Sequence, residues 1–152
     1  MNTLEEYALK IGKFWVNFNT LELLLRVYLT KHYNESEVGL ELEVSETCEV
    51  THLTNYDTFE VLARKYNSLV DSEQRLEVTS VARLRDALAH GRVTTKTQVP
   101  MTVIKYSKPQ KNSGKVLVEF KETLSAEYFD QAKDDLIKMI TLITELLNTR
   151  KV

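Results

Sequence analysis

A long amphipathic helix decides this fold, and residues 4–33 encode it as LEEYALKIGKFWVNFNTLELLLRVYLTKHY. Apolar residues recur along this stretch at steps of three and four, which places them on one helix face. Thr3 and Glu6 have the spacing of a capping box at its start. We therefore predict one helix that runs to about Tyr33. Its apolar stripe comprises Leu4, Tyr7, Ile11, Phe14, Trp15, Phe18, Leu21, Leu25, Tyr28 and Leu29.

Two shorter helices are predicted next. Asp57 or Thr58 can cap a second helix that runs to about Leu69. Ser72 precedes a third helix. We expect this third helix to end at His90–Gly91, because glycine readily takes the left-handed conformation that closes a helix.

A β-hairpin and a last helix complete the predicted fold. Residues 101–106 and 115–120 are β-branched, aromatic and alternating, and the SKPQKNSG segment between them is rich in turn-forming residues. Ser125 can cap the last helix. Residues 1–152 therefore predict a single, mainly α domain: a bundle of about four helices with a β-hairpin inserted before the last one.

The composition excludes several classes of protein. The longest stretches without a charged residue span eight residues, whereas a transmembrane helix needs about 20 apolar ones, so no membrane span is expected. The N-terminal residues are acidic where a secretion signal would be basic, and Cys48 is the single cysteine, so we expect a cytoplasmic protein. Metal-ligand spacings and phosphate-binding loops are missing from the sequence, so no metal or cofactor is expected.

Charge is unevenly distributed along the chain. Residues 1–60 carry a net charge of −7, and residues 61–152 carry a net charge of +5. Six glutamates and no basic residue lie within 35–49, where alternating leucine, valine and glutamate predict an extended segment or a mobile acidic loop. A basic section can hold a polyanion by releasing its counterions, although for the charge asymmetry alone a solvated surface in both sections is the better explanation.

The most specific feature of the sequence is VARLRDALAHGRV, residues 81–93. Asp86 and His90 are four residues apart, so on a helix they share a face and can touch. A phosphate would stabilise a cluster of arginines here, because guanidinium groups bind phosphate through paired hydrogen bonds. The arginines expected to gather around the imidazole are Arg83, Arg85 and Arg92.

This stretch resembles the motif of the HEPN superfamily of small helical proteins, which is an arginine, four to six residues and a histidine. Arg85, Asp86 and His90 match the motif positions, although asparagine is commoner than aspartate at the second one. The resemblance covers most of the chain, because the predicted order of helices is also similar. It implies a HEPN-like fold for residues 1–152.

The resemblance also implies a function: a metal-independent endoribonuclease that works as a homodimer, with the motif helices facing across the two-fold axis. Many members of the superfamily are toxins of toxin–antitoxin pairs or effectors of phage defence. Others have lost catalysis and bind protein or nucleotide partners. RNA is therefore the expected substrate, and a cognate antitoxin or another protein is a candidate partner.

The candidate catalytic residues are Arg85, Asp86 and His90. Imidazole has a reference pKa of about 6.5, which suits it to take the proton of an RNA 2′-hydroxyl near neutral pH. Arginine stabilises the charge that develops on the phosphoryl oxygens, and Asp86 can orient the imidazole. The candidate substrate-binding residues are Arg83, Arg92, Lys108 and Lys111; Lys105 and Lys115 lie with the last two at the tip and flanks of the predicted hairpin.

Other interpretations stay open at this point. His90 also suits a helix C-terminus, because a cation there interacts favourably with the helix dipole. The hairpin lysines also protect an exposed edge strand from pairing with other chains. The alternative function is a catalytically silent HEPN-like module that holds a phosphate. In a third interpretation the acidic segment 35–49 mimics nucleic acid and covers a basic site of a partner.

The remaining expectations concern the first helix and two histidines. Glu22 lies on the apolar stripe and is explained by an i,i+4 ion pair with Arg26. His32 and His52 have no evident partner and are expected to be exposed. Leucines on both sides of the first helix predict a homodimer, because one bundle core buries only one side. These leucines are Leu21, Leu23, Leu24 and Leu25.

Overall fold

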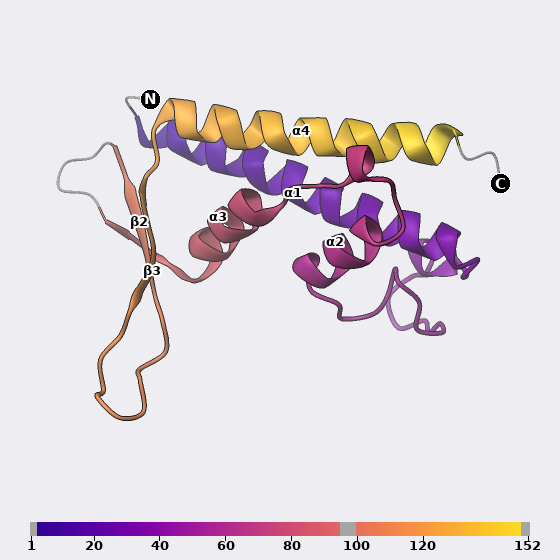
Figure 1. The fold of residues 1–152 in the computed structure, drawn as a ribbon, viewed down its shortest axis with the longest axis horizontal. Helices are drawn as coiled ribbons and strands as arrows, with labels where there is room; N and C mark the ends of the chain where they lie inside the picture. The colour runs from indigo at the N-terminus through magenta and orange to yellow at the C-terminus, as the bar shows by residue number, and fades with distance from the viewer. Residues whose placement is uncertain (1–2, 95–99, 150–152) are drawn as a thin grey trace. The chain divides into compact units, whose positions relative to one another are not determined.

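The computed structural model describes residues 3–94 and 100–149. Within these ranges the chain forms four α-helices, two short 3-10 helices and one antiparallel sheet (Figure 1). The α-helices are α1 (Leu4–His32), α2 (Phe59–Asn67), α3 (Thr79–His90) and α4 (Ala126–Thr149). The prediction of a mainly helical chain with a small antiparallel element before the last helix is thus confirmed. No helix in the described ranges is long and apolar enough to cross a bilayer.

The chain divides into two compact units, and the residues of α1 and α4 are shared between them. The first unit comprises residues 1–16 and 79–135, which hold the start of α1, all of α3, the sheet and the start of α4. The second comprises residues 17–78 and 136–152, with the rest of α1, all of α2 and the rest of α4. Each unit therefore contains segments of three helices.

Tyr7 ties the elements of the first unit together. Its hydroxyl donates to the carbonyl of Leu124 at 2.6 Å and accepts from the backbone N–H of Met101 at 3.1 Å. Its ring meets Phe129 of α4 edge to face. Ser125 caps α4 as predicted, because its hydroxyl accepts from the backbone N–H of Tyr128. The sheet and the start of α4 are thus held against the start of α1.

The sheet has three strands where the sequence predicted two. Its order is β1 (Arg92–Thr94), β2 (Thr102–Tyr106) and β3 (Val118–Thr123), and both pairings are antiparallel. The predicted hairpin is therefore β2 and β3. The added strand β1 is exposed at all three positions, so it lacks the alternation of buried and exposed residues from which a strand is predicted.

Gly91 is needed at the end of α3 for a different reason from the predicted one. Its backbone is not left-handed; among the described glycines only Gly114 has a positive φ. A Cβ at position 91 would instead lie 2.3 Å from the carbonyl oxygen of Ala87 and 3.0 Å from that of Ile104. Because glycine has no side chain, the backbone at position 91 can lie close to both the last turn of α3 and strand β2. His90 is therefore held next to the sheet.

Gly91→Ala is expected to destabilise the protein by about 2 kcal/mol, because backbone atoms have to move to admit the methyl group. Gly12→Ala is the matched control: it lies within α1 with no atom within 4 Å of the added methyl group, and it should stabilise the fold by about 0.5–1 kcal/mol. Urea unfolding of both variants measures the difference. A Gly91→Ala variant as stable as wild type would contradict this role.

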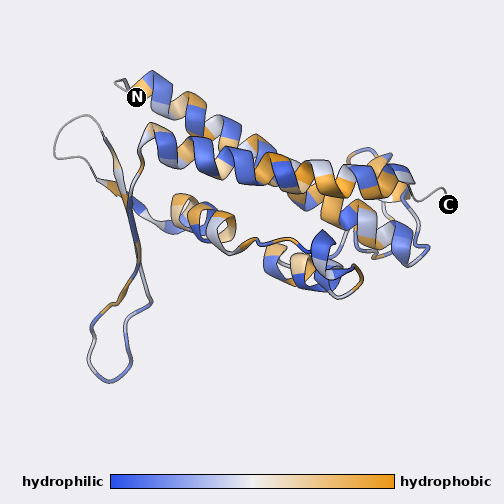
Figure 2. Cartoon of the chain, turned by 45° about the horizontal axis from the view of Figure 1, so that its top comes forward, coloured by the Kyte–Doolittle hydropathy of each residue, from blue (hydrophilic) through white to orange (hydrophobic). Residues whose placement is uncertain are grey.

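The second unit has an aromatic and aliphatic core, and Figure 2 marks the hydrophobic positions along its helices. Thr58 caps α2 through a hydrogen bond from the backbone N–H of Val61, as one of the two predicted caps. The rings of Phe18 and Phe59 lie 4.4 Å apart between centroids, and Tyr28 meets Tyr66 edge to face at 4.8 Å. The buried side chains of this unit include Leu21, Leu25, Leu29, Leu62, Leu136, Met139 and Ile143.

The helix predicted after Ser72 begins later than expected. Residues Ser72–Gln74 form only a 3-10 helix, and α3 starts at Thr79. The side chain of Asn67 explains the delay: it accepts from the N–H of Leu76 at 2.8 Å and donates to the carbonyl of Leu76 at 2.9 Å. These bonds hold the backbone of Leu76 outside a helix, so a contact between distant residues overrides the local cap signal.

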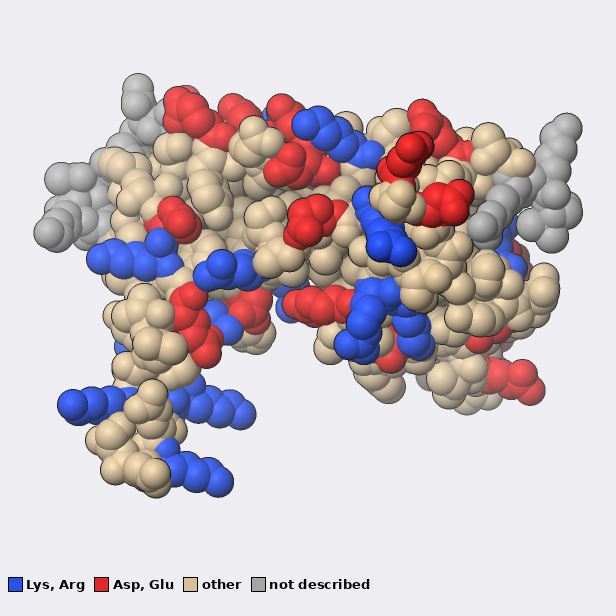
Figure 3. All heavy atoms as spheres, in the orientation of Figure 1, with Lys and Arg blue, Asp and Glu red and all other residues tan. Residues whose placement is uncertain are grey.

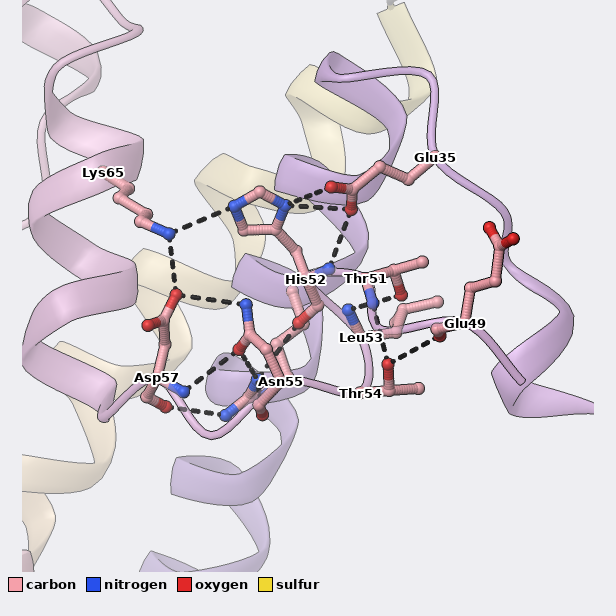
Figure 4. Close-up of polar contacts among 10 residues, drawn as sticks. Glu35, Glu49, Thr51, His52, Leu53, Thr54, Asn55, Asp57 and Lys65 are labelled. Carbon is pink, nitrogen blue, oxygen red and sulfur yellow. Dashed lines mark hydrogen bonds and ion pairs between the residues drawn. The ribbon is translucent and has the colours of Figure 1, made fainter. Parts of the chain in front are cut away.

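A polar cluster holds the loop between α1 and α2 (Figure 4). The backbone N–H and Nδ1 of His52 contact the Glu35 carboxylate at 2.8 and 2.9 Å, and Nε2 lies 3.3 Å from Nζ of Lys65. Lys65 in turn binds Asp57 at 2.7 Å. The expectation that His52 is exposed is wrong, since only 13% of its side-chain surface is accessible.

This cluster also lowers the pKa values of two carboxyl groups. The hydrogen bond from Lys65 lowers the pKa of Asp57. Burial raises the pKa of Glu35, but the hydrogen bonds from the backbone and ring of His52 outweigh it and hold that pKa below its usual value. The acidic segment 35–49 is thus anchored at its start, and it forms the 3-10 helix Val38–Leu40 and turns, not an extended strand.

Candidate functional site

The last two turns of α3 carry the motif residues. His90 and Asp86 lie on one face, as the four-residue spacing predicts, with His90 Nε2 3.9 Å from Asp86 Oδ1. This separation suits a weak ion pair and is longer than a hydrogen bond. The side chain of His90 is 65% exposed. The imidazole is therefore accessible to a ligand and only loosely held by its neighbour.

The principal partner of Asp86 is a lysine of the sheet. Lys105 Nζ lies 2.5 Å from Asp86 Oδ2 and 2.9 Å from the Glu119 carboxylate. The hydrogen bonds to Asp86 and then to Glu119 raise the pKa of Lys105 above its usual value. Lys105 was expected among the solvated lysines of the hairpin; it faces α3 instead and neutralises the charge of Asp86.

An irregularity in the sheet gives Glu119 its place. Lys105 pairs with Phe120 and Tyr106 pairs with Val118, so Glu119 is an extra residue on β3. Such a bulge bends a strand and changes the direction of its side chains, and bulges are common beside functional sites. Here the bulged residue meets Lys105 with its carboxylate and accepts a 3.3 Å hydrogen bond from Arg83 with its carbonyl.

The three arginines of the 81–93 stretch do not converge on His90. The guanidinium of Arg85 lies over the ring of Trp15 in α1, 5.9 Å from its centroid. Arg83 lies 6.0 Å from the centroid of Phe120 and lines a hollow of about 390 Å³ that also holds Glu122. Of these arginines, Arg92 is the one that shares a hollow with His90.

The hollow at His90 and Arg92 is the best candidate for a binding site. Its volume is about 460 Å³, within the range of ligand sites in proteins. The Arg92 guanidinium lies 5.7 Å from the centroid of the Tyr106 ring. None of the residues that line the hollow is acidic; they are His90, Arg92, Tyr106, Ser107, Pro109 and Val116. The site therefore offers a proton acceptor and a guanidinium without a repelling carboxylate in its wall.

The remaining predicted binding residues lie on the connection between β2 and β3, residues 107–117, which we call the arm. Lys108, Lys111 and Lys115 are exposed there, and the arm contains no acidic residue. Figure 3 shows basic side chains reaching out from its end. The arm is ordered by its own hydrogen bonds, such as the one from the N–H of Gln110 to the carbonyl of Lys115 at 2.8 Å.

Asp86→Asn tests whether the Lys105 contact supports this site. We expect it to lower the free energy of unfolding by about 1 kcal/mol, because the neutral amide holds Lys105 less firmly than the carboxylate does. Asp134→Asn, at an exposed acid that pairs with the adjacent Lys133, is the control and should stay within about 0.5 kcal/mol of wild type. An Asp86→Asn variant as stable as wild type in urea unfolding would show that the contact with Lys105 does not support this region.

Sequence reasoning missed two aromatic residues of this region. Trp15 was assigned to the apolar stripe of the first helix, but it also supports Arg85. Tyr106 was counted only as a strand residue, although it joins Arg92 in the wall of the hollow. The available signal was its position at the end of a predicted strand, just before the turn that carries the lysines.

No family model, curated protein or solved structure matches this chain.

Proposed function

We propose that this protein is a metal-independent endoribonuclease of the HEPN type, with His90 and Arg92 at its reactive centre. The observation that carries the proposal is that Arg92 and the exposed imidazole of His90 line one hollow. The arm supplies Lys108 and Lys111 for neighbouring phosphates, since lysine binds a phosphate backbone without regard to sequence.

The reaction follows from these side chains. His90 takes the proton of a ribose 2′-hydroxyl, and the 2′-oxygen attacks the adjacent phosphorus. The bond from phosphorus to the 5′-oxygen breaks, and that oxygen takes a proton from water. The products are a 2′,3′-cyclic phosphate and a 5′-hydroxyl. The Arg92 guanidinium stabilises the charge on the phosphoryl oxygens during the attack.

A mixed RNA pool incubated with the purified protein in EDTA tests this function. We expect cleavage to persist in EDTA, because His90, Arg92 and water supply every proposed step. The 5′ fragments should end in a 2′,3′-cyclic phosphate. Cleavage that EDTA abolishes, or 5′ fragments that end in a 3′-hydroxyl group, would overturn the proposal.

The proposed enzyme is a homodimer. Leu21 and Leu25 are fully buried within the chain, so the prediction that a second copy covers them is wrong. Leu9 and Val16 of α1 are 58% and 66% exposed, lie seven residues apart and belong to the unit that holds His90. They give a second copy an apolar helix face. Light scattering should give twice 17.6 kDa; a mass of 17.6 kDa at high micromolar concentration would contradict the dimer.

The position of Arg85 favours a second candidate, a catalytically silent module that binds RNA or a nucleotide. The resemblance assigns Arg85 to the reactive centre, but here its guanidinium lies over Trp15 and outside the walls of the His90 hollow. In this case Arg92 and the arm hold phosphates without turnover. RNA that binds tightly and stays intact in the assay above would support this candidate.

A further inference from the structure

The hollow at His90 has an apolar wall that the proposed cleavage does not use. Tyr106, Pro109 and Val116 form it, and they come from the end of β2 and the base of the arm. Tyr106 is 39% exposed, so its ring is accessible although it ends a paired strand. This apolar wall therefore suits a flat apolar group. His90 and Arg92, the polar part of the lining, suit an anion.

The tyrosine is held firmly at this place. It pairs with Val118 immediately after the bulge. The next residue, Ser107, donates its N–H to the carbonyl of Leu117 at 2.8 Å, and its hydroxyl accepts from the N–H of Leu117 at 2.9 Å. The hydrogen bonding between the strands thus continues past the last strand pair, and the backbone is hydrogen-bonded on both sides of Tyr106.

The Arg92 guanidinium near the Tyr106 ring adds to this surface. Aromatic rings and guanidinium planes both stack on nucleic-acid bases. The two residues come from neighbouring strands, since Arg92 pairs with Ile104 and Tyr106 lies two residues further along β2. A nucleotide places its phosphate within one sugar of its base, so one hollow can receive both groups.

We propose that Tyr106 is a stacking platform for one unpaired RNA base, whose phosphate binds at Arg92 and His90. This inference rests on the proposed function, because it fills the same hollow, and it adds the substrate class: single-stranded RNA. A base inside a duplex is stacked and paired on both sides and does not reach the ring. Tyr106 is thereby a binding residue that sets which RNA the site accepts.

A binding experiment with uncleavable RNA tests the platform apart from catalysis. The probe is a short single-stranded 2′-O-methyl oligonucleotide containing 2-aminopurine, whose fluorescence is quenched on stacking. Tyr106→Leu keeps the apolar bulk but removes the aromatic face, so we expect about 5- to 100-fold weaker binding and loss of the quench. Tyr106→Phe should bind like wild type. The control is Tyr56→Leu, at a fully exposed tyrosine of the other unit, which should change nothing.

Equal affinity of Tyr106→Leu and wild type for this probe, or an equal loss of affinity for duplex RNA, would overturn the platform. The first result would mean that Tyr106 only supports Arg92. If circular dichroism shows Tyr106→Leu to be misfolded, Tyr106→Trp decides, because a larger ring should bind the probe more tightly. If the protein binds the probe through Tyr106 but does not cleave RNA, the stacking role of Tyr106 stands and only the proposed ribonuclease activity is contradicted. If Tyr106→Leu cleaves RNA with an unchanged KM, only the stacking role of Tyr106 is contradicted.

Discussion

His90→Ala is expected to lower the rate of RNA cleavage by about 10²–10⁴-fold, which corresponds to a barrier increase of about 3–5 kcal/mol. The imidazole is the group that takes the 2′-hydroxyl proton in the proposed reaction. Its side chain is 65% exposed, and its one polar contact within residues 3–94 and 100–149 is the 3.9 Å approach to Asp86. Its removal should therefore leave the free energy of unfolding within about 0.5 kcal/mol of wild type.

The measurement is single-turnover cleavage of one labelled RNA, with urea unfolding on the same samples. Lys138→Ala, at an exposed lysine of α4 in the other unit, is the control for loss of a surface cation. Cleavage that persists in His90→Ala would mean that the reactive centre lies elsewhere, and the binding module would then be the better account.

Arg85→Ala separates the two interpretations of the motif arginine. The HEPN resemblance assigns Arg85 to catalysis, so its removal should then lower cleavage as strongly as His90→Ala does, without a change in stability. A guanidinium that mainly packs on Trp15 predicts the opposite, namely a loss of stability of about 1 kcal/mol with cleavage largely retained. Trp15→Leu should reproduce the second result.

The helices were predictable because their signals are local. The capping box of α1 is formed as expected: the hydroxyl of Thr3 accepts from the N–H of Glu6, whose carboxylate accepts from the N–H of Thr3. Thr58 and Ser125 likewise cap α2 and α4. In each case the residues that determine the helix start lie within three positions of one another, so the sequence alone contains the interaction.

The features that were missed depend on residues far apart in the chain. The start of α3 is delayed by Asn67, nine residues before the Leu76 backbone that it binds. His52 meets Glu35, 17 residues earlier, and no spacing announces that pair. At the candidate site, the four-residue separation predicted the contact of Asp86 with His90, whereas the stronger contact with Lys105 depends on strand pairing and a bulge.

A single arginine of α1 fastens the loop that the acidic segment leads into. The Arg26 guanidinium donates to the carbonyls of His52, Asn55 and Asp57 at 2.9–3.1 Å. It also binds Glu22 at 2.9 Å, which confirms the predicted i,i+4 pair. The Arg26 side chain is only 13% exposed, so these bonds are largely shielded from water.

Arg26→Ala is therefore expected to lower the free energy of unfolding by about 3 kcal/mol. Its removal leaves three partly buried carbonyls and the Glu22 carboxylate without their donor. Arg26→Lys should recover only part of this loss, because one ammonium group cannot reproduce the fork of a guanidinium. Lys31→Ala is the matched control on the same helix: its ion pair with Glu37 is more than 40% exposed on both sides, and its loss should cost no more than about 0.5 kcal/mol. Urea unfolding gives these differences, and hydrogen exchange of residues 52–57 localises them. An Arg26→Ala variant no less stable than Lys31→Ala would show that the polar cluster of His52, Glu35, Lys65 and Asp57 holds the loop without the arginine.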